Sequence, residues 1–480
     1  MRFGGVFLTY CSKTVMGRRL LKHTPIRGSI ILNFCAKTAS VILFWGNRMK
    51  SVWEKDIVRE SFPSLAENKG TDVLIIGGGI AGILCADRLR RAGVDCMLVE
   101  AKRICMGVSG NTTAKVTFAH GLLYEGLIRR FGVKKAGLYL KAQEQALSEY
   151  ARIACTVDCD YRENDAFVYT LRNKSKIVGE IAALNRLGVP AVYTDAEALP
   201  FPVTGALCVK GQAEINPLKL LYGLARDLPI YENTKVQELI GQKAITQKCE
   251  ITFKRLVVAT HFPIFNKQGL YFLKMYQHRS YVLALENAPN VRGMYVDEAN
   301  RGLTFRNYGE LLLLGGGGHR TGKSGGCWQE LEDFAAKHYA DARIVAKWAT
   351  QDCMTLDGMP YIGRYARHTP NVYVTTGFNK WGMTSAMVAA TLLADLICGK
   401  STPYADLFSP SRSVFHPQLA ANAFHSVIGL LTPTTPRCPH LGCALQYNAV
   451  EHSWDCPCHG SRFAEDGELL DNPATDDKKL

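Results

Sequence analysis

Two short runs of cysteine and histidine near the C-terminus constrain this chain more than any other feature. They are Cys438-Pro439-His440-Leu441-Gly442-Cys443 and Cys456-Pro457-Cys458-His459-Gly460-Ser461. Each run pairs a thiolate with an imidazole, once as C-x-H and once as C-x-x-H. A [2Fe–2S] cluster with cysteine on one iron and histidine on the other needs this ligand set. Zinc is the alternative, because four cysteines and two histidines in close spacing also suit zinc, although neither run holds the usual C-x-x-C pair.

The two runs closely resemble the cluster loops of a Rieske domain. The resemblance implies that Cys438 and Cys456 bind the inner iron, and that His440 and His459 bind the outer, solvent-facing iron. It also implies a disulfide between Cys443 and Cys458, as in the Rieske proteins of respiratory cytochrome complexes.

The chain departs from the full Rieske pattern in two ways. Only residues 424–436 precede the first loop as candidate sheet, which predicts a minimal domain over residues 437–480. In the respiratory subtype, a serine at the position of Ser461 bonds a bridging sulfide of the cluster, and this chain keeps that serine. The same subtype has a tyrosine that bonds a cysteine sulfur at the position of Phe463, which has no hydroxyl. One fewer bond to sulfur predicts a reduction potential below that of respiratory Rieske centres.

A second motif lies far upstream. The apolar run from Thr71 to Ile76 predicts a buried parallel strand, and Gly77-Gly78-Gly79-Ile80-Ala81-Gly82 after it fits G-x-G-x-x-G. A predicted helix and a second strand ending on Glu100 follow. These glycines allow a pyrophosphate to approach the backbone, and Glu100 suits a ribose 2′-OH. The unit predicts binding of a dinucleotide, either FAD or NAD.

Two later features favour FAD. The loop Ser109-Gly110-Asn111-Thr112-Thr113 and the turn Gly377-Phe378-Asn379-Lys380-Trp381-Gly382-Met383-Thr384 resemble the flavoprotein family of D-amino acid and glycine oxidases (DAO). The resemblance covers roughly residues 70 to 400. It implies a cofactor site formed by Gly77, Gly79, Ala81, Gly82, Glu100, Ser109, Thr112, Thr113, Val236, Gly377, Gly382, Met383 and Thr384.

Catalytic residues are weakly determined by the sequence. Arg279, with Arg306 and Arg320 as rivals, could hold a substrate carboxylate by paired hydrogen bonds. His319 follows the glycine run 315–318 and could lie beside the flavin, and the resemblance places Trp381 at the pyrimidine side of the flavin. For each of them a structural role is the alternative.

The predicted fold class is α/β, with a Rossmann-like (βαβ) FAD domain, a β-rich substrate domain and a small all-β cluster domain. The expected parts are a disordered basic extension (1–69), the flavoprotein region (70–400), a partly extended proline-rich linker (401–436) and the cluster domain (437–480). Within the flavoprotein region, we expect a helix over 327–349 and a strand at Leu311–Leu314 that breaks open at the following glycines.

Composition narrows the remaining possibilities. The net charge is +14, but residues 1–53 hold nine Lys or Arg and no acid, so the rest is only mildly basic. No basic patch interleaved with aromatics argues for nucleic-acid binding. Most of the sixteen cysteines are scattered singly, which indicates a reducing cytoplasm. The apolar stretch 29–45 is short for a membrane span and could belong to a targeting segment, but a start at Met49 is favoured, and membrane association is not.

Together these features predict a dehydrogenase for an amine, an amino acid or a similar small molecule. FAD would take electrons from the substrate, and the cluster would pass them to an external acceptor protein or quinone. Two alternatives remain open: a non-enzymatic electron relay or redox sensor, and an NAD(P)H-driven reductase. Only one nucleotide fingerprint is found, which disfavours the reductase.

Overall fold

The computed structural model describes residues 51–55, 57–265, 268–299, 301–413, 415–433 and 436–478. All of them belong to one compact unit, Lys50–Leu480, while the unit Met1–Met49 lies outside the described residues, and with it the three readings of the N-terminus. The predicted disorder is wrong for residues 51–55. There the short helix η1 (Val52–Glu54) is held by Trp53, which is fully buried, stands edge-on to Tyr308 and donates from Nε1 to the Thr112 carbonyl at 2.8 Å.

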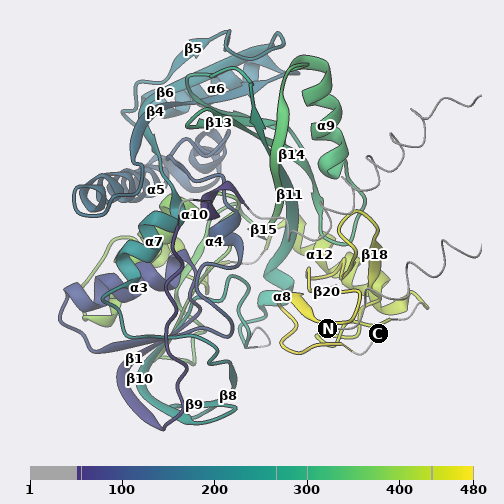
Figure 1. Ribbon diagram of the computed structural model, residues 1–480. Coiled ribbons are helices and arrows are strands. Elements are labelled where there is room, and N and C mark those ends of the chain that lie inside the picture. Colours follow the sequence, from purple (N-terminus) through teal and green to yellow (C-terminus); the bar gives the residue numbers. More distant parts are fainter. Residues whose placement is uncertain are drawn as a thin grey trace, which may run out of the picture. The chain divides into compact units, whose positions relative to one another are not determined.

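The first sheet builds the predicted nucleotide-binding half (Figure 1). Its strand order is β16-β17-β10-β1-β2-β7, with β8 and β9 attached beside β10. The strands from β17 to β7 run parallel, and β16 pairs antiparallel with β17. Their bounds are β1 (Lys69–Ile76), β2 (Cys96–Val99), β7 (Ile230–Tyr231), β8 (Val236–Ile240), β9 (Lys243–Thr246), β10 (Glu250–Val258), β16 (Tyr361–Arg364) and β17 (Val372–Thr376).

Helices cover this sheet and link it to the rest of the fold. The helix α10 is rich in alanine and buried along most of its length, so it packs closely on α3 and on α5. The helix α5 is interrupted at Gly132, whose φ is +80°. The bounds are α3 (Ile80–Arg91), α4 (Val108–Asn111), α5 (Tyr124–Ala154), α7 (Pro217–Ala225), α10 (Gly382–Ile397) and α11 (Ala405–Phe408).

The second sheet is the predicted substrate domain. Its order is β15-β11-β14-β13-β12-β4-β6-β3, with β5 beside β6. The helices α6 (Lys174–Arg186), α8 (Tyr271–Lys274) and α9 (Cys327–His338) contact it. The strands are β3 (Lys115–Val116), β4 (Arg162–Thr170), β5 (Val192–Thr194), β6 (Gly205–Glu214), β11 (Met275–Glu286), β12 (Met294–Asp297), β13 (Thr304–Tyr308), β14 (Leu311–Arg320) and β15 (Arg343–Thr355).

Two predictions for this sheet are wrong. The strand β14 does not break open at its glycines but runs through them to Arg320, because β11 pairs with it on both sides of a bulge. The predicted helix 327–349 ends at His338, and the residues from Arg343 onward form β15. Pairing with β11 along the whole of β15 outweighs local helix preference there.

The C-terminal residues form a small antiparallel sheet, β18-β19-β20-β21, as predicted for the cluster domain. The strands are β18 (Gln446–Asn448), β19 (Ser453–Asp455), β20 (Arg462–Ala464) and β21 (Leu469–Asp471). Of residues 424–436, those that the structure describes form no strand, because the helix α12 (Pro417–Leu431) occupies most of this part of the linker. Pro417 at the first helical position favours this start, and no proline interrupts the helix after it. Among the described residues, no helix has the length and apolarity to cross a bilayer.

Candidate functional site

The turn from β1 into α3 has the close approaches that a dinucleotide site requires. A Cβ on Gly82 would lie 1.9 Å from the Gly77 carbonyl oxygen, and one on Gly77 would lie 2.6 Å from that of Ala259. Gly77 also has φ +113°, a conformation that side chains rarely adopt. A side chain at either position would therefore clash with backbone, as expected for the tight glycine turn before a dinucleotide-binding helix.

Glu100 is placed at the end of β2 as predicted. Its carboxylate accepts from the backbone N–H of Gly78 at 2.8 Å and of Lys102 at 2.9 Å. Burial raises the pKa of Glu100, and these two N–H groups act against that rise. Ser109 on α4 also points at this turn, since its hydroxyl accepts from the N–H of Ile80 at 2.8 Å. The acid and the loop thus meet around the glycines, which fits the adenosine end of FAD.

Other predicted cofactor residues lie on elements that converge on this turn or on the late turn. The carbonyl of Thr113 accepts from Arg306 at 2.8 Å, and that of Met383 accepts from the Tyr150 hydroxyl at 2.8 Å. The hydroxyl of Thr384 contacts His120 Nε2 at 3.1 Å. Ala81 and Val236 are buried, on α3 and β8.

The late turn between β17 and α10 is fixed against the second sheet. A Cβ on Gly377 would lie 2.3 Å from the Thr355 side chain, and Asn379 bonds both the Thr355 N–H and the Gly377 carbonyl. Trp381 stacks on His120 with ring centroids 4.7 Å apart, just before Gly382 begins α10. Burial lowers the pKa of His120 to about 3, so this ring is neutral.

One face of the second sheet carries a charged group that the sequence reasoning missed. His278 on β11 lies directly opposite Asp352 on β15, and the charge of Lys380 in the late turn acts on both. Desolvation raises the pKa of Asp352 to about 6, against the charges of Lys380 and Arg279. Desolvation lowers the pKa of Lys380, against Asp352. Lys380 lies within the turn of residues 377–384. Its positive charge is the one local signal in the sequence that points to a role at this site.

The two cluster loops have the same backbone form. Gly442 donates to the Cys438 carbonyl and Gly460 to the Cys456 carbonyl, each at 2.9 Å. All four thiols are buried, and the Sγ atoms of Cys443, Cys456 and Cys458 lie within 4.8 Å of one another. The side chains of Cys438 and Cys456 hydrogen-bond each other, which brings the fourth thiol to the group.

The imidazoles complete the predicted ligand set. The rings of His440 and His459 have centroids 5.0 Å apart, and His459 Nδ1 is buried with no hydrogen-bond partner among the described residues. A buried nitrogen without a partner next to four thiols fits an iron ligand. Cys443 and Cys458 are free thiols in this structure, side by side, so their disulfide remains a prediction.

The two histidines differ in exposure, which the sequence did not predict. His440 is half-buried, whereas His459 is 1 % exposed. Ser426 of α12 lies 3.3 Å from His459 Nε2, and the Phe272 ring stands edge-on to it. Of the two histidines predicted to bind the outer iron, His440 therefore keeps some access to solvent, whereas the protein covers His459.

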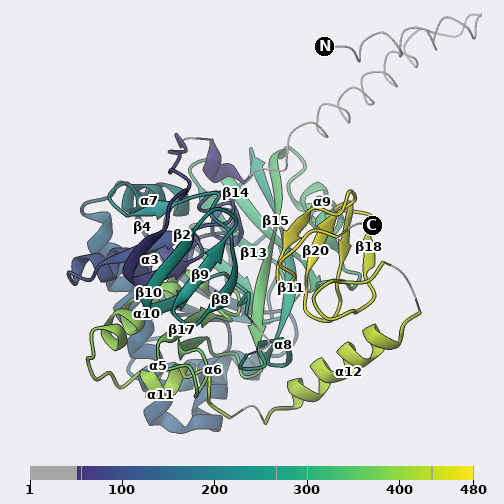
Figure 2. The ribbon, with the colours of Figure 1, turned by 90° about the horizontal axis from the view of Figure 1, so that it is seen from below.

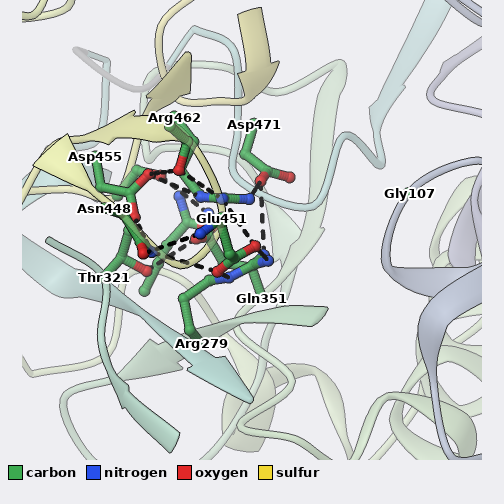
Figure 3. A network of polar contacts seen from close by, with 12 residues as sticks. Gly107, Arg279, Thr321, Gln351, Asn448, Glu451, Asp455, Arg462 and Asp471 are labelled. Atoms are coloured by element: carbon green, nitrogen blue, oxygen red, sulfur yellow. Dashed lines mark hydrogen bonds and ion pairs between the residues drawn. The ribbon is translucent and has the colours of Figure 1, made fainter. Parts of the chain in front are cut away.

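Arg279, predicted as catalytic, lies on the face of the second sheet that meets the cluster domain (Figure 3), and His319, the other such prediction on this sheet, is its register partner on β14. Arg279 is 4 % exposed and pairs with Glu451, so a protein carboxylate takes the position expected for a substrate. His319 lies opposite Arg279 and is acted on by the same Glu451. Arg306 bonds carbonyls of the Ser109 loop region, and Arg320 donates to the carbonyls of Pro457 and Cys458. Trp381 alone of the three lies at the late turn.

Glu451 is the centre of this interdomain network. It accepts from Arg462 at 2.9 Å and from the Tyr281 hydroxyl at 2.8 Å, besides Arg279. Arg462 also holds Asp455 and Asp471. Burial alone would raise the pKa of Glu451, but the charges of Arg279 and Arg462 outweigh burial and hold it at about 2.

Two buried amides join the second cluster loop to the same sheet. Gln277 on β11 donates to the carbonyls of His459 at 3.0 Å and Asn472 at 2.7 Å. Gln351 on β15 donates to the Gly460 carbonyl at 2.9 Å and to Gln277 at 2.7 Å. We call Gln277 and Gln351 the amide pair. Their partners are far away in sequence, so no local signal could have found them.

Comparison with known proteins agrees with both halves. The family model of FAD dependent oxidoreductases (DAO) matches residues 72–396, and the model of the Rieske [2Fe-2S] domain matches residues 429–479. YhfW of Bacillus subtilis (strain 168), described as a Rieske 2Fe-2S iron-sulfur protein, is 34% identical over 490 residues, which cover 88% of this chain and 96% of that protein.

Two further relatives match the flavoprotein part. Gamma-glutamylputrescine oxidoreductase of Escherichia coli (strain K12) is 26% identical over 70% of this chain and 86% of its own length. The crystal structure of L-proline dehydrogenase from P. horikoshii shares the fold, with a TM-score of 0.61, 16% identity, and coverage of 72% of this chain and 98% of that one. The chain therefore belongs to the DAO family of FAD dependent oxidoreductases and carries a Rieske domain, so that it is an enzyme with FAD and a [2Fe–2S] cluster as its cofactors.

Proposed function

We propose that the protein is a dehydrogenase of an amine or amino acid whose electrons leave the flavin through the Rieske cluster to an external acceptor. The observation that carries this proposal is the position of β11 and β15 between the two cofactor domains (Figure 2). Alternate residues of these strands point to opposite sides of the sheet. One side carries His278 and Asp352, on which the late-turn Lys380 acts, and the other carries Gln277 and Gln351, which bond the second cluster loop.

Contacts on the two sides support this arrangement. Gln277, Arg279 and Gln351 bond the cluster domain. The opposite side carries His278 and Asp352, on which the late-turn Lys380 acts. On that side Trp348 also donates to the Asn111 carbonyl in the loop beside the dinucleotide turn, at 3.0 Å. These contacts support a path of one sheet layer between the proposed flavin and cluster sites.

The cluster domain is held on this sheet rather than tethered loosely. Asn472 donates to the carbonyls of Thr260 and Phe262, both at 2.7 Å. Between these two residues, the carbonyl of His261 accepts a hydrogen bond from the hydroxyl of Thr376. Thr376 directly precedes the late turn. Together with the amide pair and Glu451, these contacts support transfer within one chain at a fixed separation, without movement of the cluster domain.

The charges at the late turn suit an amino acid or amine. Asp352 offers a carboxylate for an ammonium group, and Lys380 offers an ammonium group for a carboxylate. Trp381, which follows Lys380 in the chain, stacks on the neutral ring of His120. Oxidation of a C–N bond to C=N removes two electrons, which bound FAD would accept and the cluster would pass on singly.

Anaerobic titration of the holoenzyme with a panel of amino acids and amines tests the proposal. Bleaching of the flavin absorbance by a member of the panel, followed by reduction of the cluster, is the expected result. Bleaching by NADH alone would instead identify a reductase. If no member of the panel and no nicotinamide reduces the flavin, the relay or sensor remains and the dehydrogenase is ruled out.

A further inference from the structure

The helix α12 is bonded at one end to α8 and at the other end to the cluster domain (Figure 1). Its Asn422 donates to the Leu273 carbonyl of α8 at 3.1 Å. Two turns further on, the Gly429 carbonyl accepts at 2.9 Å from the backbone N–H of Ala444, which directly follows the first cluster loop. A Cβ on Gly429 would lie 2.4 Å from Cys458 Sγ in the second loop. These contacts fix the side chains between Asn422 and Gly429 on the same helix face relative to the cluster loops.

Ser426 lies on that face and meets a predicted iron ligand. Its Oγ is 3.3 Å from His459 Nε2 and 3.0 Å from the carbonyl oxygen of Asn422. A serine hydroxyl has one hydrogen to donate and further lone pairs to accept with. Because the Asn422 carbonyl can only accept, the hydroxyl hydrogen goes to it, and an Oγ lone pair faces the imidazole. His459 Nε2 is therefore the donor in its hydrogen bond with Ser426.

The other ring nitrogen of His459 agrees with this direction. His459 Nδ1 is buried without a hydrogen-bond partner among the described residues. A neutral imidazole carries its hydrogen on one nitrogen, so donation from Nε2 leaves the lone pair of Nδ1 for the iron. Proteins commonly hold a metal-bound histidine through a hydrogen bond from its second nitrogen. The Phe272 ring also stands edge-on to this imidazole, with centroids 5.8 Å apart, and limits its rotation.

We propose that Ser426 is a positioning residue of the cluster site, whose hydroxyl accepts from His459 Nε2 and so keeps Nδ1 directed at the iron. A hydrogen bond from the second nitrogen makes the imidazole a stronger electron donor, which stabilises the oxidised cluster and lowers its reduction potential. The competing role for Ser426 is to pack and stabilise α12 alone. The proposal concerns only how the cluster is held, so it does not depend on the proposed dehydrogenase function.

Redox titration and EPR spectroscopy of the full-length holoprotein test this proposal. The cluster is reduced with dithionite, so no substrate is needed, and isotope-labelled histidine reports the coupling of each ligand nitrogen to the reduced cluster. Ser426→Ala removes the hydroxyl, whereas Ser426→Thr keeps it. The matched control is Thr432→Ala at the end of α12. The Thr432 hydroxyl bonds the carbonyl four residues earlier, that of Ile428, at 2.8 Å, as Ser426 bonds that of Asn422.

Ser426→Ala should raise the equilibrium constant for cluster reduction roughly threefold to tenfold, and tenfold corresponds to about 59 mV for one electron. The coupling of one histidine nitrogen should change while that of the other stays. Ser426→Thr and Thr432→Ala should both resemble the wild type.

A potential or a nitrogen coupling that stays at the wild-type value in Ser426→Ala would overturn the proposal. The same shift in Ser426→Thr or in Thr432→Ala would overturn it as well, because the hydroxyl of Ser426 would then not be its cause. If Ser426→Ala does not retain its cluster, the iron content of Ser426→Thr decides, since retention supports the proposal and loss overturns it. None of these outcomes depends on substrate oxidation, so they are distinct from failure of the proposed dehydrogenase.

Discussion

At the scale of single residues, Glu451 shows how a buried charge joins two domains. Its carboxylate belongs to the Rieske domain, and two of its partners, Arg279 and Tyr281, belong to β11. A buried carboxylate is tolerable only with such partners, and removing one side of a buried pair leaves the other charges uncompensated. Glu451 is therefore a sensitive point for the attachment of the cluster domain.

Glu451→Gln should destabilise the protein by roughly 3 kcal/mol at pH 7, because the pKa of Glu451 falls from 4.5 to about 2 on folding. A depressed folded pKa gives stability that is present above pH 4.5 and is lost as the pH falls toward 2. Urea unfolding at a series of pH values should show a constant difference between wild type and variant above pH 5 and a narrowing difference below. Glu67→Gln, at an exposed position, is the matched control. A difference that stays constant down to pH 3 would contradict this account.

Ser461 acts on the cluster itself. Its side chain hydrogen-bonds that of Cys438, and its hydroxyl also accepts from the Ala474 N–H at 3.0 Å. Hydrogen bonds to cluster sulfur raise the potential, so Ser461→Ala should lower the reduction potential of the bound cluster. A spectroscopic redox titration measures this, with exposed Ser324→Ala as control. An unchanged or higher potential in Ser461→Ala would show that the hydroxyl does not act on the cluster.

At the scale of elements, local motifs were predictable and the linker was not. The strand, glycine turn, helix and acid of residues 71–100 appear as β1, α3 and β2 because each signal is local. The proline content of residues 401–436 predicts a partly extended linker, but Pro417 begins a helix and the residues after it up to Leu431 lack proline, so α12 forms within the linker. The glycines of β14 and the residues after His338 differ from the prediction because of distant partners. In both places pairing with β11 makes the segment a strand.

Gly429 tests whether α12 is part of the cluster site. A methyl group there would lie 2.4 Å from Cys458 Sγ, so Gly429→Ala must shift the helix or the loop. Iron and acid-labile sulfide per chain should fall in this variant while flavin content is retained. Gly399→Ala is unsuitable as a control because of its positive φ, but Gly126→Ala, with nothing near its added methyl, is suitable. Full cluster content in Gly429→Ala would mean that α12 can move away from the loops.

At the scale of the whole molecule, the sheet of β11 and β15 relates the two halves. The sequence identified both cofactors from local motifs, yet it assigned Arg279 and His319 to the substrate side. Which face of a strand a residue occupies depends on the register and on what packs there. The partners of Gln277, Arg279 and Gln351 lie more than a hundred residues away, so the interface could not be read from local pattern. The cofactor loops could be predicted without knowledge of distant partners, because their motifs are local.

Anaerobic single-turnover spectroscopy of the holoenzyme tests the central claim, that electrons cross this sheet from flavin to cluster within one chain. After mixing with a substrate found in the panel, the flavin should bleach first, and the cluster should then be reduced at a rate independent of protein concentration. Gln277→Leu with Gln351→Leu should slow the second phase and leave the first unchanged, while Gln329→Leu on the exposed side of α9 should change neither. A cluster that stays oxidised after the flavin is reduced, or whose reduction rate rises with protein concentration, would contradict the account.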